Sequence, residues 1–301
     1  MALSLAAPAL AAEQILVLKS RDLPQFEQAV AGFLQAWKQL APDSSVQQRT
    51  LSASARESDL LPGPNSEQVA VVAVGTEAAR WAVAHTELPV VFCMVLNARE
   101  NLLTGLSDAA SKRVAGVTLN VPLKAQFEAL HEVLPKARRI GIIFDPKNSA
   151  AIVQEAADAA KSLGLELVTR EVAKESELSA ATAWIGRRID VLWAPMDTTV
   201  FNSRSVQFVL LQMLQHQVPV VGFSENMVKA GALLAPRVDY QAVGQQTAGL
   251  LQTVLKAGMP PTPAMQPPQQ FDLVANARVN RMVGKPLVPS ARPTVNFINE
   301  D

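Results

Sequence analysis

Short apolar runs alternate with amphipathic stretches along the first part of the chain. Residues 26–40 carry apolar side chains at helical spacing, so one face of this stretch can bury itself against a sheet. Helices are also predicted over residues 78–84 and 123–133. The predicted strands are the apolar runs at residues 14–18, 46–52, 69–74, 89–95 and 114–118.

The same alternation starts again at Arg139 and continues almost to the end of the chain. The strands predicted there are residues 139–144, 165–172, 190–194, 218–223, 232–235 and 271–275. The predicted helices are residues 150–163, 175–186, a long helix from the polar turn at 195–199 to about 216, residues 224–229, residues 242–256 and a short helix from Ala277. The Pro-dense residues 259–268 predict a connector, and residues 291–301 a loosely attached tail.

The predicted strands are uniformly apolar, which is typical of parallel strands covered by helices on both faces. Regular strand–helix alternation predicts the α/β class, and two successive sets predict two doubly wound parallel-sheet lobes joined by a hinge. We assign residues 13–120 plus about 240–258 to an N-terminal lobe. A C-terminal lobe is assigned residues 121–239 plus about 266–290.

Composition narrows the function classes. The chain has 301 residues, 49% of them apolar, with 27 basic and 27 acidic side chains. A formal net charge of zero argues against a nucleic-acid partner, which requires a basic face for phosphates. The single cysteine, Cys93, cannot form an internal disulfide and is interpreted as a small buried side chain on a strand.

Residues 1–12 read MALSLAAPALAA, a run of small apolar residues before the polar pair Glu13 and Gln14. This resembles the end of a secretory signal, although the usual basic segment is missing. The alternative is a frayed apolar N-terminus. We therefore expect an exported, periplasmic protein that retains part of its signal peptide.

Signals for catalysis are weak. The chain has no glycine-rich dinucleotide or phosphate-binding motif and no nucleophile elbow. Its three histidines are scattered, so neither a metal nor another cofactor is expected. Asp145, Asp197 and Glu225 would be the candidate acids of a glycosidase, an alternative that requires them to lie close together.

Polar turns follow several predicted strands, where ligands bind in open parallel sheets. These turns are residues 20–22, 75–77, 145–149, 196–199 and 224–226. Backbone N–H groups at a helix start favour a carboxylate, and an acidic side chain opposite would hold an ammonium group. The turns therefore predict a site for a zwitterionic solute, although Ser, Thr, Asp and Asn also serve there as ordinary helix caps.

A series of short motifs carries a resemblance to a known family. They are Gly75-Thr76-Glu77-Ala78-Ala79, the LPVVF run at 88–92, Gly116-Val117-Thr118, the run LPKARRIG at 134–141, FDPKNS at 144–149, PVVGFSE at 219–225 with AGA at 230–232, and Val238-Asp239-Tyr240 with Gly244. In this order and spacing they resemble the ABC-transporter substrate-binding proteins of the tryptophan/tyrosine type.

The resemblance implies the type 1 periplasmic-binding fold and a non-enzymatic protein that closes on a small solute between its lobes. The implied partners are the solute and, transiently, an ABC permease of the inner membrane; we expect a monomer. The alternative function is a periplasmic sensing module that signals to a membrane partner.

Positions carried over from the family give the expected ligand contacts. Thr76 and Glu77 belong to one lobe, Ser224 and Glu225 are expected near the hinge, and Thr118 ends its strand. The remaining expected contacts, on the facing lobe, are Asn148, Ser149, Asp197 and Thr198. The segment 95–99 lacks the acid usual in the family, so an amino acid is expected but its side chain is left open.

Overall fold

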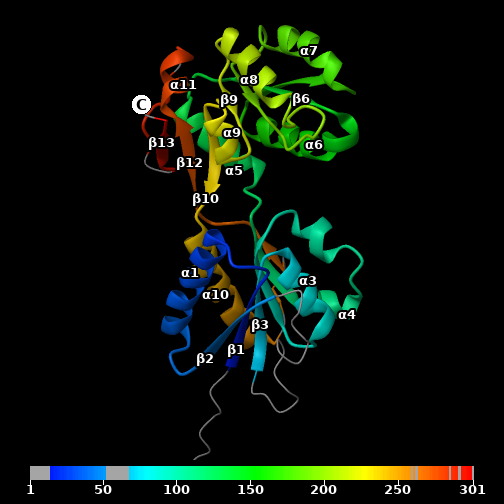
Figure 1. Ribbon diagram of the computed structural model, residues 1–301, viewed down its shortest axis with the longest axis vertical. Helices are drawn as coiled ribbons and strands as arrows, with labels where there is room; N and C mark the ends of the chain where they lie inside the picture. Colours follow the sequence, from blue (N-terminus) through cyan, green and yellow to red (C-terminus); the bar gives the residue numbers. More distant parts are fainter. Residues whose placement is uncertain are drawn as a thin grey trace, which may run out of the picture. The chain divides into compact units, whose positions relative to one another are not determined.

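The structure is a computed structural model that describes residues 14–51, 68–258, 260–261, 264–284, 286–290 and 293–299. The chain divides into two compact units (Figure 1). Unit 1 contains the described residues up to Asn120 together with Val238–Gln270, and unit 2 contains Val121–Arg237 together with the described residues from Phe271 onward. The expected residues 1–12 of the signal remnant lie outside the described residues.

Unit 1 is built on a six-stranded sheet with the strand order β11-β5-β4-β3-β1-β2. The strands are β1 (Gln14–Lys19), β2 (Ser45–Thr50), β3 (Gln68–Val74), β4 (Val90–Val95), β5 (Val114–Thr118) and β11 (Met265–Gln266). Every neighbouring pair in this sheet is parallel. The carboxyl ends of all six strands therefore point to one edge of the sheet.

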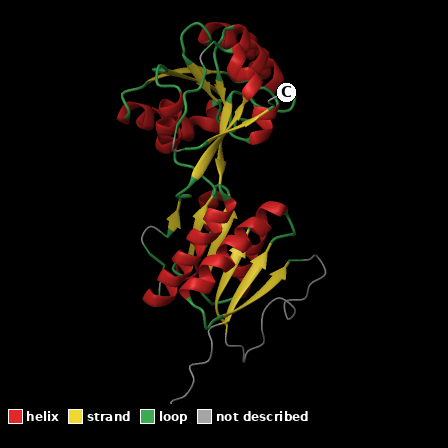
Figure 2. Cartoon of the chain, turned by 90° about the vertical axis from the view of Figure 1, so that its left-hand side faces the viewer, coloured by secondary structure: helices red, strands yellow, loops and turns green. Residues whose placement is uncertain are grey.

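Helices cover both faces of the unit 1 sheet (Figures 1 and 2). On one face α1 (Pro24–Leu40) and α10 (Tyr240–Ala257) share a core with the sheet. The other face is covered by α3 (Thr76–His85), the π-helix η1 (Arg99–Leu103) and the short α4 (Asp108–Ser111). The sequence pattern did not predict η1 or α4, which are too short for a periodic signal.

Two glycines allow α1 and α10 to pack closely. A Cβ atom on Gly32 would lie 2.0 Å from the backbone oxygen of Gln241, and one on Gly244 would lie 1.9 Å from that of Ala29. No side chain fits at either position unless one of the helices moves. The backbones of α1 and α10 are therefore in direct contact, which joins residues 240–257 to the N-terminal part of unit 1.

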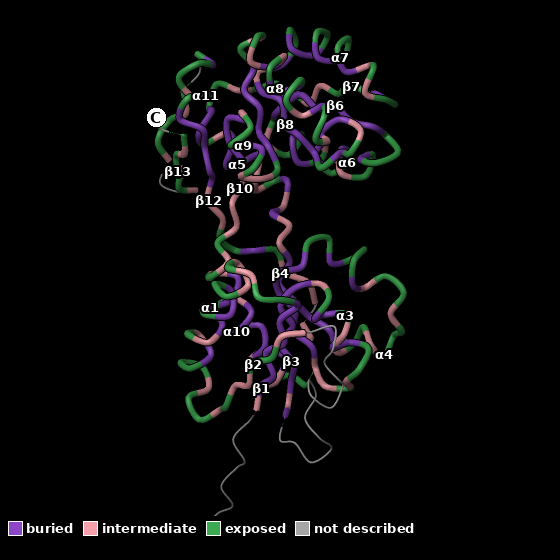
Figure 3. Tube along the Cα trace, in the orientation of Figure 1, coloured by how far each residue is buried: buried purple, intermediate pink, exposed green. Residues whose placement is uncertain are grey.

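Unit 2 is built on a seven-stranded sheet with the order β13-β12-β10-β9-β8-β6-β7. Its strands are β6 (Arg139–Phe144), β7 (Glu166–Glu171), β8 (Val191–Trp193), β9 (Val220–Val221), β10 (Leu234–Val238), β12 (Phe271–Asn276) and β13 (Val295–Ile298). The pairs from β7 through β10 are parallel, as is the pair of β12 and β13. Figure 3 shows the central strands β6 and β8 as buried.

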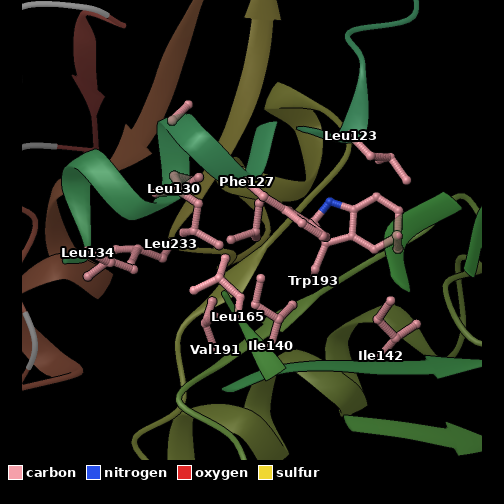
Figure 4. Close-up of a cluster of buried hydrophobic side chains, with 14 of the residues drawn as sticks. Leu123, Phe127, Leu130, Leu134, Ile140, Ile142, Leu165, Val191, Trp193 and Leu233 are labelled. Carbon is pink, nitrogen blue, oxygen red and sulfur yellow. The ribbon is translucent and has the colours of Figure 1, made fainter. Parts of the chain in front are cut away.

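Each face of the unit 2 sheet has its own core. One core includes α5 (Leu123–Val133), α6 (Pro146–Ser162) and α11 (Ala277–Met282). The other includes α7 (Leu178–Ile185), preceded by the short η2 (Glu175–Glu177), α8 (Val206–Gln215) and α9 (Glu225–Lys229). In the first core the rings of Phe127 and Trp193 meet edge to face at 5.9 Å (Figure 4).

Three sequence-based expectations about unit 2 and its borders differ from the structure. The expected tail contains β13, which pairs in parallel with β12. Residues 266–270, expected in the C-terminal lobe, lie in unit 1. The long helix expected after residue 199 begins only at Val206, because the side-chain oxygen of Asn202 accepts hydrogen bonds from the backbone N–H groups of Arg204 and Ser205 and holds a turn there.

No helix in the described ranges is both long enough and apolar enough to cross a membrane. Cys93 is buried in β4, as expected, and burial raises the pKa of its thiol to about 12. The edge strands β2, β7, β11 and β13 depart from this buried pattern, since all of their residues are partly or fully exposed.

Candidate functional site

In unit 2, the turns after β6 and β8 are joined by the carboxylate of Asp197. Its Oδ2 atom accepts hydrogen bonds from the backbone N–H of Asp145 at 2.8 Å and from the hydroxyl of Ser149 at 2.7 Å. Its Oδ1 atom accepts from the backbone N–H groups of Thr199 at 2.9 Å and Val200 at 3.1 Å. Asp197 is 1% exposed.

This geometry changes the interpretation of Asp197. Both carboxylate oxygens are occupied by groups of the protein itself, and the side chain is buried. An ammonium group would have to displace these bonds, which are costly to break inside a protein. We therefore assign Asp197 the role of positioning the two turns, and not that of a direct ligand contact. Ser149 is buried, donates to Asp197 and shares this role.

Asp145 caps α6 in the same cluster. Its carboxylate accepts from the backbone N–H of Lys147 at 3.0 Å and from the hydroxyl of Thr199 at 2.8 Å. The hydrogen bond from Lys147, followed by that from Thr199, lowers the pKa of Asp145 below its ordinary value. Asp145 and Asp197 therefore accept hydrogen bonds from their own turns, and within the described ranges no hydrogen bond or ion pair joins either carboxylate to Glu225, the third candidate acid of the glycosidase alternative.

Asn148 and Thr198 form the exposed rim of this cluster. The side-chain amide of Asn148 donates to the hydroxyl of Thr199 at 3.0 Å and reaches that of Thr198 at 3.4 Å. Both Asn148 and Thr198 are exposed. Of the four residues expected on this part of unit 2, only these two are exposed to solvent.

Ser224 and Glu225 follow β9 and begin the five-residue helix α9. The hydroxyl of Ser224 accepts from the backbone N–H of Met227 at 3.3 Å, and Glu225 forms an ion pair with Lys229 at 2.7 Å. Both are contacts of a helix start, and no hydrogen bond between described residues joins this pair to the Asp197 cluster.

In unit 1, the end of β1 and the start of α3 are joined through Ser20. Its buried hydroxyl accepts from the backbone N–H of Ala78 at 2.9 Å. Between them Gly75 has a φ of 93°, and a Cβ atom there would lie 2.6 Å from the Ser20 hydroxyl. Glycine is thus required for this close turn, and Ser20 caps the helix in place of a local side chain.

Glu77, in the first turn of α3, forms an ion pair with Arg21, which follows β1. Arg21 Nη2 and Glu77 Oε1 are 2.5 Å apart, and both side chains are more than half exposed. Thr76, beside Glu77, is partly exposed. The sequence analysis included Arg21 only as part of the polar turn at 20–22 and did not predict this pairing, because the two residues are 56 positions apart.

Thr118 ends β5 and is 9% exposed. Two residues later, Asn120 and Asn97 hold the ends of β5 and β4 together. Asn97 donates its backbone N–H to the side-chain oxygen of Asn120 at 2.8 Å, and the Asn120 amide donates to the side-chain oxygen of Asn97 at 2.6 Å. The expected contacts of unit 1 thus lie along one edge of its sheet, but among the described residues no hydrogen bond connects Thr118 with Thr76 or Glu77.

Exposed apolar side chains accompany these polar turns; from the sequence, Phe223 is one of four aromatic residues near strand ends, but Leu96 and Met196 were not predicted as part of the site. Leu96 follows β4 and is 38% exposed; in unit 2, Met196 and Phe223 follow β8 and β9 and are 46% and 36% exposed. By contrast, Phe144, Trp193 and Phe201, also close to strand ends, are buried. The signal available in the sequence was a large apolar residue directly after an apolar strand, a pattern easily taken for an extension of that strand.

The described residues contain no group of three or more His, Cys, Asp or Glu side chains that could hold a metal ion. The strand-end turns instead offer hydroxyl, amide and backbone groups, exposed ion pairs and exposed apolar side chains. This is the chemistry of noncovalent binding to a small molecule with both polar and apolar parts.

Solved structures share this fold. A ligand-free, open substrate-binding protein with adhesive properties from Clostridium difficile matches with a TM-score of 0.69 at 18% identity, covering 96% of this chain and all of that one. An ABC domain in complex with L-Trp from Streptococcus pneumonia matches with a TM-score of 0.53 at 20% identity, over 96% of this chain and all of the other. The predicted type 1 periplasmic-binding fold, with two doubly wound parallel-sheet lobes, is confirmed.

Sequence comparison gives the family. A tyrosine-binding protein of Clostridioides difficile (strain R20291) is 25% identical over 189 residues; the match covers 62% of this chain and about half, 54%, of that relative's length. The family model described as "ABC transporter substrate binding protein" matches residues 21–284. The chain therefore belongs to the ABC transporter substrate-binding proteins, a family of binding proteins and not of enzymes, as its motifs implied.

Proposed function

We propose that this protein is the periplasmic solute receptor of an ABC importer and that its ligand is an amino acid with an apolar or aromatic side chain. The observation that carries the proposal is the combination of polar turns with exposed apolar side chains at the carboxyl ends of the strands. The relative named a tyrosine-binding protein and the solved L-Trp complex support the amino-acid class.

Exposed apolar side chains in both units are available as partners for the apolar part of the ligand. Exposed Met196 and Phe223 follow neighbouring strands of unit 2, and Leu96 follows β4 of unit 1. Large apolar side chains exposed beside polar turns are typical of small-molecule sites, where apolar contact supplies affinity and a few polar groups supply orientation. We propose that these three contact the ligand side chain.

The polar part of the ligand is assigned to the partly or fully exposed members of the expected set. These are Thr76, Glu77, Asn148, Thr198, Ser224 and Glu225. Thr118 and Ser149 are buried, and we propose that they support the site through the backbone and through Asp197, respectively.

Closure of the two units on the ligand is also part of the proposal. The chain passes between the units three times, after Asn120, Arg237 and Gln270. Hydrogen bonds hold the chain on both sides of the first passage: Asn97 holds Asn120 in unit 1, and the Gln126 amide donates to the backbone oxygen of Val121 at 2.8 Å in unit 2. Such anchoring favours bending confined to the peptide between them, as in hinge motions.

Binding is tested by thermal unfolding of the purified protein with each of the twenty amino acids, followed by calorimetry on those that act. A ligand at 100 times its Kd stabilises the folded state by about 2.7 kcal/mol, which raises the melting temperature by a few degrees. We expect aromatic or large apolar amino acids to produce the rise. If no amino acid shifts the melting temperature, the proposed ligand class is wrong.

An import assay separates a role in transport from a role in sensing. Deletion of the gene should reduce import of the radiolabelled ligand, and expression of the protein should restore it. Unchanged import combined with a lost transcriptional response to the ligand would favour the alternative, a sensing module that signals to a membrane partner.

A further inference from the structure

The charged side chains at the strand ends of unit 2 are already committed to other contacts. Asp197 accepts four hydrogen bonds and Asp145 accepts two, all from groups of unit 2. Glu225 is paired with Lys229 one helical turn away on α9. The two aspartates are therefore not positioned as partners for a ligand ammonium group, and Glu225 already has a cation partner on its own helix.

In unit 1, Lys19 forms ion pairs with two acidic side chains near the end of β1. Its ammonium group lies 2.8 Å from Asp22 and 2.5 Å from Glu27, and the Lys19 side chain is only 11% exposed. Hydrogen bonds to these two carboxylates outweigh the effect of burial, so the pKa of Lys19 is raised. Lys19 thus binds both carboxylates at the end of β1 from a largely buried position, while Asp22 and Glu27 themselves are 72% and 50% exposed.

Arg21 and Glu77 remain as a pair of opposite charges that is open to solvent. Arg21 follows β1 and Glu77 lies in the first turn after β3; these strands are direct neighbours in the sheet. The side chains are 59% and 56% exposed. One positive and one negative group thus stand side by side at the carboxyl edge of the unit 1 sheet.

The structure of the two turns does not depend on this pair. Ser20 caps α3 through Ala78, and the backbone N–H of Gly75 donates to the backbone oxygen of Cys93 at 2.9 Å. The ion pair itself is exposed on both sides, and such pairs contribute little to stability. The ion pair between Arg21 and Glu77 can therefore be replaced by ion pairs with a ligand at a small cost in stability.

We propose that Arg21 and Glu77 together recognise the charged ends of the amino-acid ligand. The guanidinium group of Arg21 donates to the ligand α-carboxylate, and the carboxylate of Glu77 accepts from the ligand α-ammonium group. This inference rests on the proposed function, and it adds Arg21, a residue outside the expected set, as a determinant of specificity for zwitterions. Arginine suits the role because its planar donors match a carboxylate in two-point contact.

The first test measures affinity for the amino acid that the thermal panel identifies. Arg21→Ala and Glu77→Gln should each weaken binding by about 30-fold or more, the usual loss when one partner of a charged contact is removed. Melting temperatures without ligand should stay near wild type. Lys124→Ala is the matched control, since Lys124 and Glu128 form another exposed ion pair, on α5, and this variant should bind normally.

The decisive variant exchanges the two charges, as Arg21→Glu combined with Glu77→Arg. It keeps an ion pair between the turns but reverses the positions that the ligand meets. Our proposal expects affinity to remain at least about 30-fold below wild type. Recovery to within a few-fold of wild type would show that the pair serves only as a link between turns and would overturn the proposal.

Ligand analogues test the assignment of each charge. Tryptamine lacks the carboxylate of tryptophan, and indole-3-propionate lacks its ammonium group; tyrosine has the corresponding analogues. Arg21→Ala should bind the amine as well as wild type does, and Glu77→Gln should bind the acid as well as wild type does. Retention of the full wild-type discrimination in both variants would overturn the inference, whereas a wild-type protein that binds no amino acid would overturn the proposed function itself.

Discussion

The backbone N–H of Asp145 donates a 2.8 Å hydrogen bond to the buried carboxylate of Asp197, 52 positions further along the chain. This bond joins the turns that follow β6 and β8, whose strands are neighbours in the unit 2 sheet. The spacing between exposed Asn148 and Thr198 therefore depends on a side chain that does not itself face the solvent.

Replacement of Asp197 should reveal this positioning role. Asp197→Ala leaves four donors without their acceptor, and we expect it to lower the free energy of unfolding by about 2–4 kcal/mol. Denaturant unfolding measures the loss. Thr198→Ala is the neighbouring control and should change stability little. Normal stability with lost ligand affinity would instead return Asp197 to the set of direct ligand contacts.

Asp145 should contribute to the pH dependence of stability. Its pKa is lowered in the folded protein, chiefly by the hydrogen bond from Lys147. The stabilisation is therefore fully present above its ordinary pKa, near pH 4, and is lost as the pH falls through the lower folded-state value. Asp145→Asn should reduce the fall in unfolding free energy between about pH 5 and pH 2. Parallel curves for the two proteins would exclude this contribution.

Gly244 and Gly249, both on α10, offer a matched pair for testing the contact between α1 and α10. Gly244→Ala would place a Cβ atom 1.9 Å from the backbone oxygen of Ala29, and we expect a loss of about 1–3 kcal/mol or more in stability. Gly249 has nothing within 4 Å of its added Cβ, so Gly249→Ala should be neutral or stabilise the protein by up to about 1 kcal/mol. Equal effects of both substitutions would contradict the close-contact interpretation.

Phe223 should affect ligand choice more than folding, since it is 36% exposed. On the proposed function, Phe223→Ala should weaken binding of aromatic amino acids by about 10-fold and leave the melting temperature of the free protein almost unchanged. Leu211→Ala, at an exposed apolar position on α8, is the control. Calorimetry that gives the same affinity for Phe223→Ala and wild type would remove Phe223 from the site.

The fold followed from the sequence because its strands are continuous apolar runs between helix-forming stretches. β5, α5 and β6 have the predicted bounds. Prediction failed where local side-chain chemistry decided the outcome, as at Asn202, and where a short strand depends on a distant partner, as in β13. Neither kind of contact leaves a periodic signal.

The candidate site was predicted less well than the fold. Turns after strands indicated where polar groups would gather, but not which ones are buried against each other. Asp197 and Thr198 are adjacent in sequence, yet one is enclosed and the other exposed. The partnership of Arg21 with Glu77 depends on the pairing of β1 with β3, which only the assembled sheet provides.

The alternation of the chain between the units has a consequence for synthesis. Unit 1 gains α10 and β11 only after most of unit 2 has been made, and unit 2 gains β12 and β13 last. A ribosome that has reached residue 237 has therefore completed neither sheet, and the groove along α1 at Gly32 still lacks α10. Native packing of both units must wait for nearly full-length polypeptide, so a truncated translation product would expose the apolar faces of two unfinished cores.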